Sequence, residues 1–139
     1  VLARVVASGA AGVDPRMMGV GPVPATRKAL AQAKWSVSDL DLVELNEAFA
    51  AQVLAVLKCL RSEEFAREHL GRSRYVAKIS KERLNVNGGA IALGHPIAAT
   101  GSILIGTVLD ELERRGLSTG LVTMCAAGGM APAIIIERI

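Results

Sequence analysis

Short apolar runs and longer helix-forming runs alternate along this chain, and this alternation constrains the fold more than any other feature. Strands are expected at 2–8, 40–45, 85–87, 120–125 and 133–138, and helices at 25–34, 47–60, 62–69 and 99–115. An alternation that closes on two successive strands predicts an α/β layered domain, with a mixed β-sheet packed by helices on both faces.

The helix expected over 99–115 is apolar on more than one narrow stripe. Its apolar residues are Ile103, Leu104, Ile105, Val108, Leu109 and Leu112, and Gly116 ends it. Such a helix needs cover on more than one side. The strongly apolar helix at 47–60 is likewise expected to be buried, whereas the charged segment 62–84 is expected to be a surface insert.

Bulk properties fit one domain of 139 residues and exclude several classes of protein. A net charge of +3 is too small to indicate nucleic-acid binding but suits an anionic ligand. No segment predicts a transmembrane helix or a signal peptide. Cys59 and Cys125 have neither zinc nor disulfide spacing, which indicates a reducing cytoplasm or organelle matrix. Because the chain opens at Val1 without a methionine, we expect a fragment or a processed chain.

A first polar segment, Asn46-Glu47, separates an expected strand from an expected helix. Two interpretations are open. Asn46 can be a helix N-cap with Glu47 in the first turn, which is a common arrangement. Alternatively, both belong to a functional site.

A second polar segment, Gly94-His95-Pro96, lies in the glycine-rich stretch 88–101. A residue before proline is disfavoured in a helix, so His95 is expected in an irregular loop. It is either a structural histidine or a general base working near neutral pH. His69, within the charged insert, is interpreted as a solvated surface residue.

A third segment, Cys125-Ala126-Ala127-Gly128-Gly129, follows an expected strand. It is either a tight turn with an inert cysteine or a partly open site for a reactive thiol. A histidine, a cysteine and an asparagine, each at the end of an element, can converge on one pocket as an acid–base site.

Four ordered motifs give the chain a strong resemblance to the thiolase family. They are Gly12-Val13-Asp14-Pro15 with Met18-Gly19, then Asn46-Glu47-Ala48-Phe49, then the run from Asn87-Gly88-Gly89 to Gly94-His95-Pro96, and finally the Cys125 glycine turn. The resemblance covers nearly the whole chain and implies that residues 1–139 are a thiolase C-terminal domain. We therefore expect the N-terminal thiolase domain, with the nucleophilic cysteine, to be absent from this chain, because Cys59 does not have the setting of that nucleophile.

The resemblance also implies roles for individual residues. His95 would take the proton of the nucleophilic cysteine, and Cys125 would move the proton at the acetyl α-carbon and later activate coenzyme A. Asn46 would hold a water that, with His95, binds the thioester oxygen. Backbone groups at Ala127 and Gly128 would form a second oxyanion site. Met18, Phe49 and Gly94 would contact the substrate.

Finer features are similar to the branch that contains the trifunctional-enzyme β-subunit, which cleaves 3-ketoacyl-CoA in fatty-acid oxidation. They are the insert at 62–84 and the variants at Ala98 and Ala127, where many members have glycine. A biosynthetic acetoacetyl-CoA thiolase and a non-catalytic CoA-binding scaffold remain alternatives. The resemblance implies acyl-CoA and CoA as substrates, no covalently bound cofactor, no metal, a homo-oligomer, and no activity for this chain alone.

Overall fold

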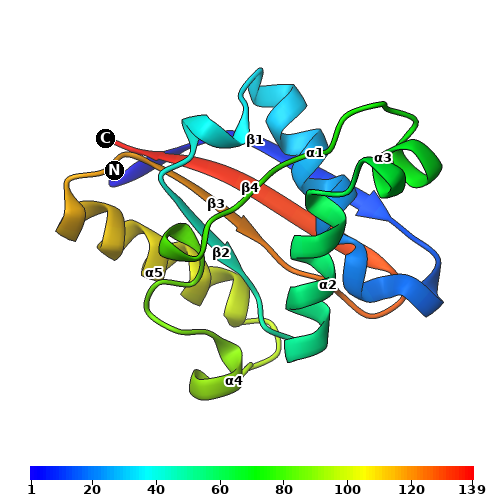
Figure 1. The fold of residues 1–139 in the computed structure, drawn as a ribbon. Coiled ribbons are helices and arrows are strands. Elements are labelled where there is room, and N and C mark those ends of the chain that lie inside the picture. The colour runs from blue at the N-terminus through cyan, green and yellow to red at the C-terminus, as the bar shows by residue number, and fades with distance from the viewer.

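The computed structural model describes residues 1–139, and a four-stranded sheet with helices on both faces forms its centre (Figure 1). The strands lie in the order β1 (Ala3–Gly12), β4 (Met130–Arg138), β3 (Thr119–Thr123) and β2 (Leu42–Leu45). Only β2 and β3 are parallel, while the β1–β4 and β4–β3 pairs are antiparallel. The expected mixed α/β sheet is therefore confirmed.

Two helices cover opposite faces of this sheet because the strand side chains alternate. On one face, α1 (Pro22–Ala33) packs against β1 and β4, and Val43 joins that core with Ala29. On the other face, α5 (Thr100–Arg115) packs against β2 and β3, and Leu42 joins that core with Val108. Neighbouring residues of β2 thus serve different layers.

The remaining helices are short and lie around the sheet. They are α2 (Ala50–Leu60), α3 (Glu63–Leu70), the single turn α4 (Ala90–Leu93), and the 3-10 helices η1 (Pro15–Val20), η2 (Val37–Asp39) and η3 (Lys81–Arg83). Ser62 caps α3, because its Oγ accepts a hydrogen bond from the Phe65 N–H at 3.0 Å. The insert is charged but not loose, since its residues Ala66 and Ala77 are fully buried.

Two expectations for local structure are wrong. The second helix begins at Ala50 rather than at 47, and along it only Gln52, Val56 and Leu60 are buried, so one face remains open. Residues 85–87 form no strand. Leu84 instead makes a single bridge to Val43, which covers the outer edge of β2 at one point.

The helix α5 is buried on the sheet side alone. Leu104, Val108 and Leu112 are covered, whereas Ile103 is 47% exposed. This chain by itself therefore does not supply the second layer of cover that the apolar pattern of α5 favours. No helix has the length and apolarity needed to cross a bilayer.

Ala98 adopts a left-handed backbone conformation, with φ of 68°, immediately before α5. Only Lys34 and Asn85 share a positive φ among the non-glycine residues, so Ala127 is accommodated without this strain. The left-handed conformation costs a residue with a Cβ about 1–2 kcal/mol, whereas glycine loses about 0.5–1 kcal/mol of extra chain entropy.

We expect Ala98→Gly to raise the free energy of unfolding by about 0.5–1 kcal/mol, because relief of strain exceeds the entropy loss. Urea denaturation measures it. Ala55→Gly, within α2, is the matched control and should lower stability by about 1 kcal/mol. A destabilised Ala98→Gly variant would contradict the assignment of strain to this position.

Candidate active site

The parallel strands β2 and β3 finish at the same edge of the sheet, and the predicted site residues gather there. Asn46 follows β2, and its N–H donates to the Thr123 carbonyl at 3.0 Å, which extends the pairing by one residue. Its side chain is 1% exposed. Asn46 is therefore not a helix N-cap; that position of α2 belongs to Phe49.

His95 lies in the loop between α4 and α5, as expected, and contacts Asn46. Its Nε2 is 3.4 Å from Asn46 Nδ2, and its Nδ1 is 2.7 Å from Thr100 Oγ1. The Thr100 hydroxyl in turn donates to the Pro96 carbonyl at 3.0 Å. His95 itself is exposed, whereas Asn46 and Thr100 behind it are buried.

These contacts suit one tautomer of His95. With the one Thr100 hydroxyl proton donated to the Pro96 carbonyl, Thr100 Oγ1 accepts a hydrogen bond from His95 Nδ1–H. In the neutral ring the proton is then on Nδ1, and Nε2 carries the lone pair and accepts from the Asn46 amide. A ring held in this way presents Nε2 as a base.

Thr100 is a site residue without an assigned role in the sequence interpretation. It sits at the first position of α5, five residues after His95, and is 4% exposed. A buried threonine at a helix start is usually a local cap, so the spacing alone gives no signal. Its partnership with His95 depends on the path of the intervening loop.

Glu47 binds the loop that carries His95 rather than the first turn of α2. Its carboxylate accepts hydrogen bonds from the Ile91 N–H at 3.2 Å and from Asn85 Nδ2 at 3.3 Å. It also lies against Gly89, where any Cβ would overlap the carboxylate. Glycine is required there because the charged group approaches the backbone closely.

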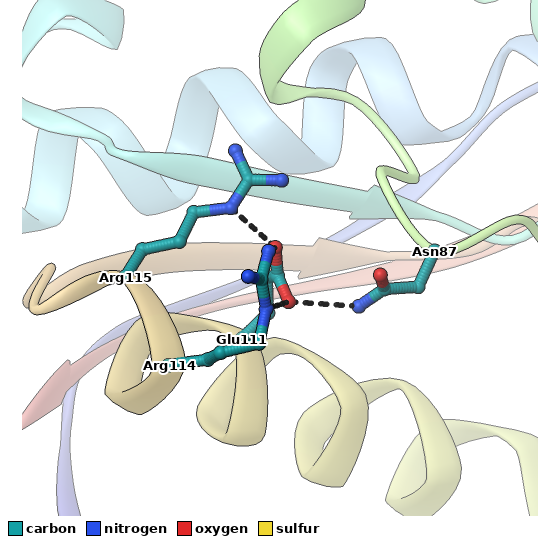
Figure 2. A network of polar contacts seen from close by, with 4 residues as sticks. All are labelled: Asn87, Glu111, Arg114 and Arg115. Atoms are coloured by element: carbon teal, nitrogen blue, oxygen red, sulfur yellow. Dashed lines mark hydrogen bonds and ion pairs between the residues drawn. The ribbon is translucent and has the colours of Figure 1, made fainter.

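A second carboxylate anchors the same loop to α5, as Figure 2 shows. Asn87 Nδ2 donates to Glu111 Oε2 at 3.2 Å, and Arg114 and Arg115 bind the same carboxylate. The Glu111 side chain is 3% exposed. Hydrogen bonding from Arg114, with smaller contributions from Asn87 and Arg115, lowers the pKa of Glu111 to about 2 despite its desolvation.

Cys125 lies just beyond β3, at the edge where Asn46 follows β2. Of the two interpretations of this segment, burial of the thiol matches the tight turn, because Cys125 is 6% exposed. Burial raises the pKa of its thiol, so the sulfur keeps its proton at neutral pH. The next residues turn tightly through Gly128 and Gly129, both with φ of 85°, and Ala127 and Gly128 are exposed.

The residues predicted to contact substrate are in open or half-buried positions. Phe49 is 62% exposed, Gly94 is exposed with φ of +92°, and Met18 is half-buried in η1. Gln52 of α2 donates to the Gly19 carbonyl at 3.1 Å and so joins the segments of Phe49 and Met18. The structure joins Asn46 with His95 directly, and no hydrogen bond links either of them to Cys125.

The other candidate side chains lie elsewhere. His69 is half-exposed, stacks on Phe65 with ring centroids 4.6 Å apart, and lines a cavity of about 230 Å³ that contains none of the predicted catalytic residues. Cys59 is half-buried in α2, and burial raises the pKa of its thiol. No group of three or more histidine, cysteine or acidic side chains is arranged to hold a metal ion.

Fold and site together define an α/β domain with a histidine–amide pair at the carboxyl edge of its parallel strands. The sequence model described as "Thiolase, C-terminal domain" matches residues 1–138, and the chain belongs to this family.

Similar proteins include an acetyl-CoA acetyltransferase of Rhizobium meliloti (strain 1021), which is 51% identical over 99% of this chain and 31% of its own length. A 3-ketoacyl-CoA thiolase of Klebsiella pneumoniae (strain 342) is 52% identical over 86% of this chain and 28% of its own length. The crystal structure of the Bacillus anthracis acetyl-CoA acetyltransferase superposes with a TM-score of 0.84 at 44% identity, covering 99% of this chain and 31% of that one. The chain thus spans about a third of these relatives.

We expect Glu111→Gln to destabilise the protein at neutral pH, because two guanidinium groups lose their carboxylate. A carboxyl group whose folded-state pKa is depressed stabilises the fold above its unfolded value and loses this effect as pH falls toward about 2. The difference between wild type and variant should therefore be constant above about pH 5 and shrink below it. Thermal unfolding between pH 2.5 and 7 measures this, with the exposed Glu113→Gln on the same helix as control. A pH-independent difference would contradict the ionic role of Glu111.

Proposed function

We propose that this chain is the C-terminal catalytic half of a 3-ketoacyl-CoA thiolase that acts in fatty-acid oxidation. The reaction is the transfer of an acyl group to coenzyme A, with release of acetyl-CoA, or the reverse condensation. The single observation that carries the proposal is the His95 ring, which is anchored at Nδ1 by Thr100 and presents a basic Nε2 beside the Asn46 amide.

In the first step, His95 Nε2 would take the proton from a nucleophilic cysteine supplied by the N-terminal half. The resulting thiolate attacks the 3-keto carbonyl and forms a covalent acyl-enzyme. Thr100 fixes the ring through Nδ1, and Nε2 has only to release the long 3.4 Å contact with the Asn46 amide before proton transfer.

Cys125 would then act as an acid and afterwards as a base. When the bond between C2 and C3 of the substrate breaks, the departing acetyl-CoA carbanion takes the Cys125 proton. Burial supports this role, because a thiol with a raised pKa retains the proton until a strong base appears. The thiolate left behind removes the proton of incoming coenzyme A, whose sulfur attacks the acyl-enzyme and releases the shortened acyl-CoA.

Two oxyanion sites would stabilise the charge that develops on the substrate oxygens. Asn46, through a water, and protonated His95 would serve the thioester oxygen, and backbone N–H groups near Ala127 and Gly128 the other. The exposed glycine turn supports the second site, since it is fastened to the loop after β1 by Val13 N–H donating to the Gly129 carbonyl at 2.8 Å. Donors fixed in this way need no reorganisation during reaction.

The partners would be an N-terminal thiolase domain and further copies of the enzyme. Large apolar side chains are exposed on α2, α4, α5 and the His95 loop. Their exposure supports the binding of a partner domain over them. These side chains are Phe49, Leu54, Ile91, Leu93, Ile97 and Ile103. Coenzyme A and acyl-CoA would be substrates rather than resident cofactors, and two free cysteines suit a reducing cytoplasm or organelle matrix.

A biosynthetic acetoacetyl-CoA thiolase is the second candidate. Relatives called acetyl-CoA acetyltransferase are as similar to this chain as those called 3-ketoacyl-CoA thiolase, at 51% and 52% identity. Comparing kcat/KM for thiolysis of acetoacetyl-CoA with that for a 3-ketoacyl-CoA of eight to sixteen carbons separates them. A preference for acetoacetyl-CoA would favour the biosynthetic reaction.

We expect His95→Gln and Cys125→Ala in the full-length enzyme each to lower kcat for thiolysis by about 10²–10⁴-fold, because each removes a proton-transfer group. The chain offers matched controls in its other histidine and its other cysteine. His69→Gln and Cys59→Ala should leave the rate within about twofold, since neither side chain contacts the site residues. Unchanged rates in the first two variants would instead favour a non-catalytic scaffold.

Residues 1–139 expressed alone should show no thiolysis of 3-ketoacyl-CoA, because they lack the nucleophilic cysteine. Loss of absorbance of the magnesium-enolate form of the substrate measures turnover. Adding the separately expressed N-terminal half is the positive arm and should restore some activity. Sustained turnover by residues 1–139 alone would disprove the assignment of the nucleophile to the other half.

A further inference from the structure

Glu44 is a buried carboxyl group that the proposed reaction does not use. It lies on β2, two residues before Asn46, and is 2% exposed. Its Oε2 is buried without a hydrogen-bond partner. A buried ionised carboxylate in this condition is costly, so the group requires either a proton or a donor.

Glu44 and Asn46 project from the same face of the strand. Leu42 packs with Leu104 and Val108 of α5, and side chains two residues apart along a strand share a face. The extended pairing continues to Asn46 through its N–H bond to Thr123. Both polar side chains therefore face the layer that contains α5 and the His95 loop.

Asn46 also has an unsatisfied acceptor, because its Oδ1 is buried without a partner. The amide turns Nδ2 toward His95 Nε2, at 3.4 Å, and this leaves Oδ1 on its other side. Two acceptor atoms on neighbouring positions of one strand face thus have no donor between them.

We propose that Glu44 is a positioning residue whose protonated carboxyl donates a hydrogen bond to Asn46 Oδ1, directly or through one water, and so holds Asn46 Nδ2 against His95 Nε2. The resulting hydrogen bonds all donate in one direction: from Glu44 to Asn46, from Asn46 to His95, from His95 to Thr100, and from Thr100 to Pro96. The catalytic role of this series of hydrogen bonds rests on the proposed thiolase function.

The charges around Glu44 favour its neutral form. Burial, followed by repulsion from Glu47 and Glu111, raises the pKa of Glu44 to about 7. Glu47 follows β2, and Glu111 faces the sheet from α5; the guanidinium groups of Arg114 and Arg115 on that helix are bound to Glu111. Below about pH 7 Glu44 is a donor. Above it, the ionised group is a second acceptor facing Asn46 Oδ1, and the amide loses its orientation.

The test compares Glu44→Gln, which keeps N–H donors without ionising, with Glu44→Leu, which removes the donor. The surface change Glu113→Gln is the control. All are made in the protein expressed from its complete reading frame, and folding is checked by thermal unfolding. The first readout is kcat for thiolysis between pH 6 and 8.5, expressed as the ratio of variant to wild type. The second is the ¹⁵N NMR signal of the His95 ring at pH 7 and 8.5.

Glu44→Gln should match the wild type at pH 6, and its ratio should rise by several-fold at pH 8.5, while the Glu113→Gln ratio stays flat. Glu44→Leu should lower kcat on the order of tenfold at pH 6, because it leaves Asn46 Oδ1 buried without a hydrogen-bond donor. The His95 signal should show the Nδ1–H tautomer in wild type and Glu44→Gln and a mixture in Glu44→Leu.

An unchanged His95 signal and rate in a folded Glu44→Leu variant would overturn the proposal, as would a flat Glu44→Gln ratio. If the wild type shows no thiolysis at all, the proposed function fails, yet the NMR signal still decides whether Glu44 orients Asn46. A destabilised Glu44→Leu variant leaves the ratio of Glu44→Gln to wild type as the deciding measurement.

Discussion

Parallel pairing of β2 with β3 places two strand ends at one edge of the sheet, and the rest of the site is arranged around that edge. The Asn46 N–H bond to Thr123 prolongs the pairing and fixes the buried amide beside the end of β3, where Cys125 follows. A ligand at this edge meets backbone donors and side chains from both strands, which is the usual location of sites in open α/β sheets. The flanking helices α1 and α5 cover opposite faces of the sheet rather than this edge.

The loop from Leu84 to His95 is held by carboxylates as well as by hydrophobic packing of Leu84 and Val86. Glu47 binds its backbone and Asn85, and Glu111 holds Asn87 from the opposite side (Figure 2). Glu47 lies just after β2 and Glu111 lies on α5. The position of the loop is therefore fixed relative to these two elements. This explains how a glycine-rich segment that favours no regular structure can present one histidine in one tautomer.

Sequence reasoning found the layers and four of the five expected strands because apolar alternation is local, whereas the strand order depends on long-range pairing. It also found Asn46 and His95 through the motifs, and the structure joins them. It did not give roles to Thr100, Glu44 or Glu111, because each acts through partners distant in sequence or through an unusual loop path. It left two interpretations open for Asn46 and two for Cys125, since neither local pattern shows what packs above a residue. The sequence shows Glu44 as an acidic residue between apolar residues of β2, but it does not show that this carboxyl group is buried.

The burial of Cys125 affects how readily its thiol is oxidised or alkylated. Peroxides and alkylating agents attack the thiolate, and their rate depends on access as well as on ionisation. Cys125 is shielded and retains its proton, whereas Cys59 is half-buried on α2. A buried and protonated thiol of this kind is oxidised to sulfenic and sulfinic acid more slowly than an exposed thiolate.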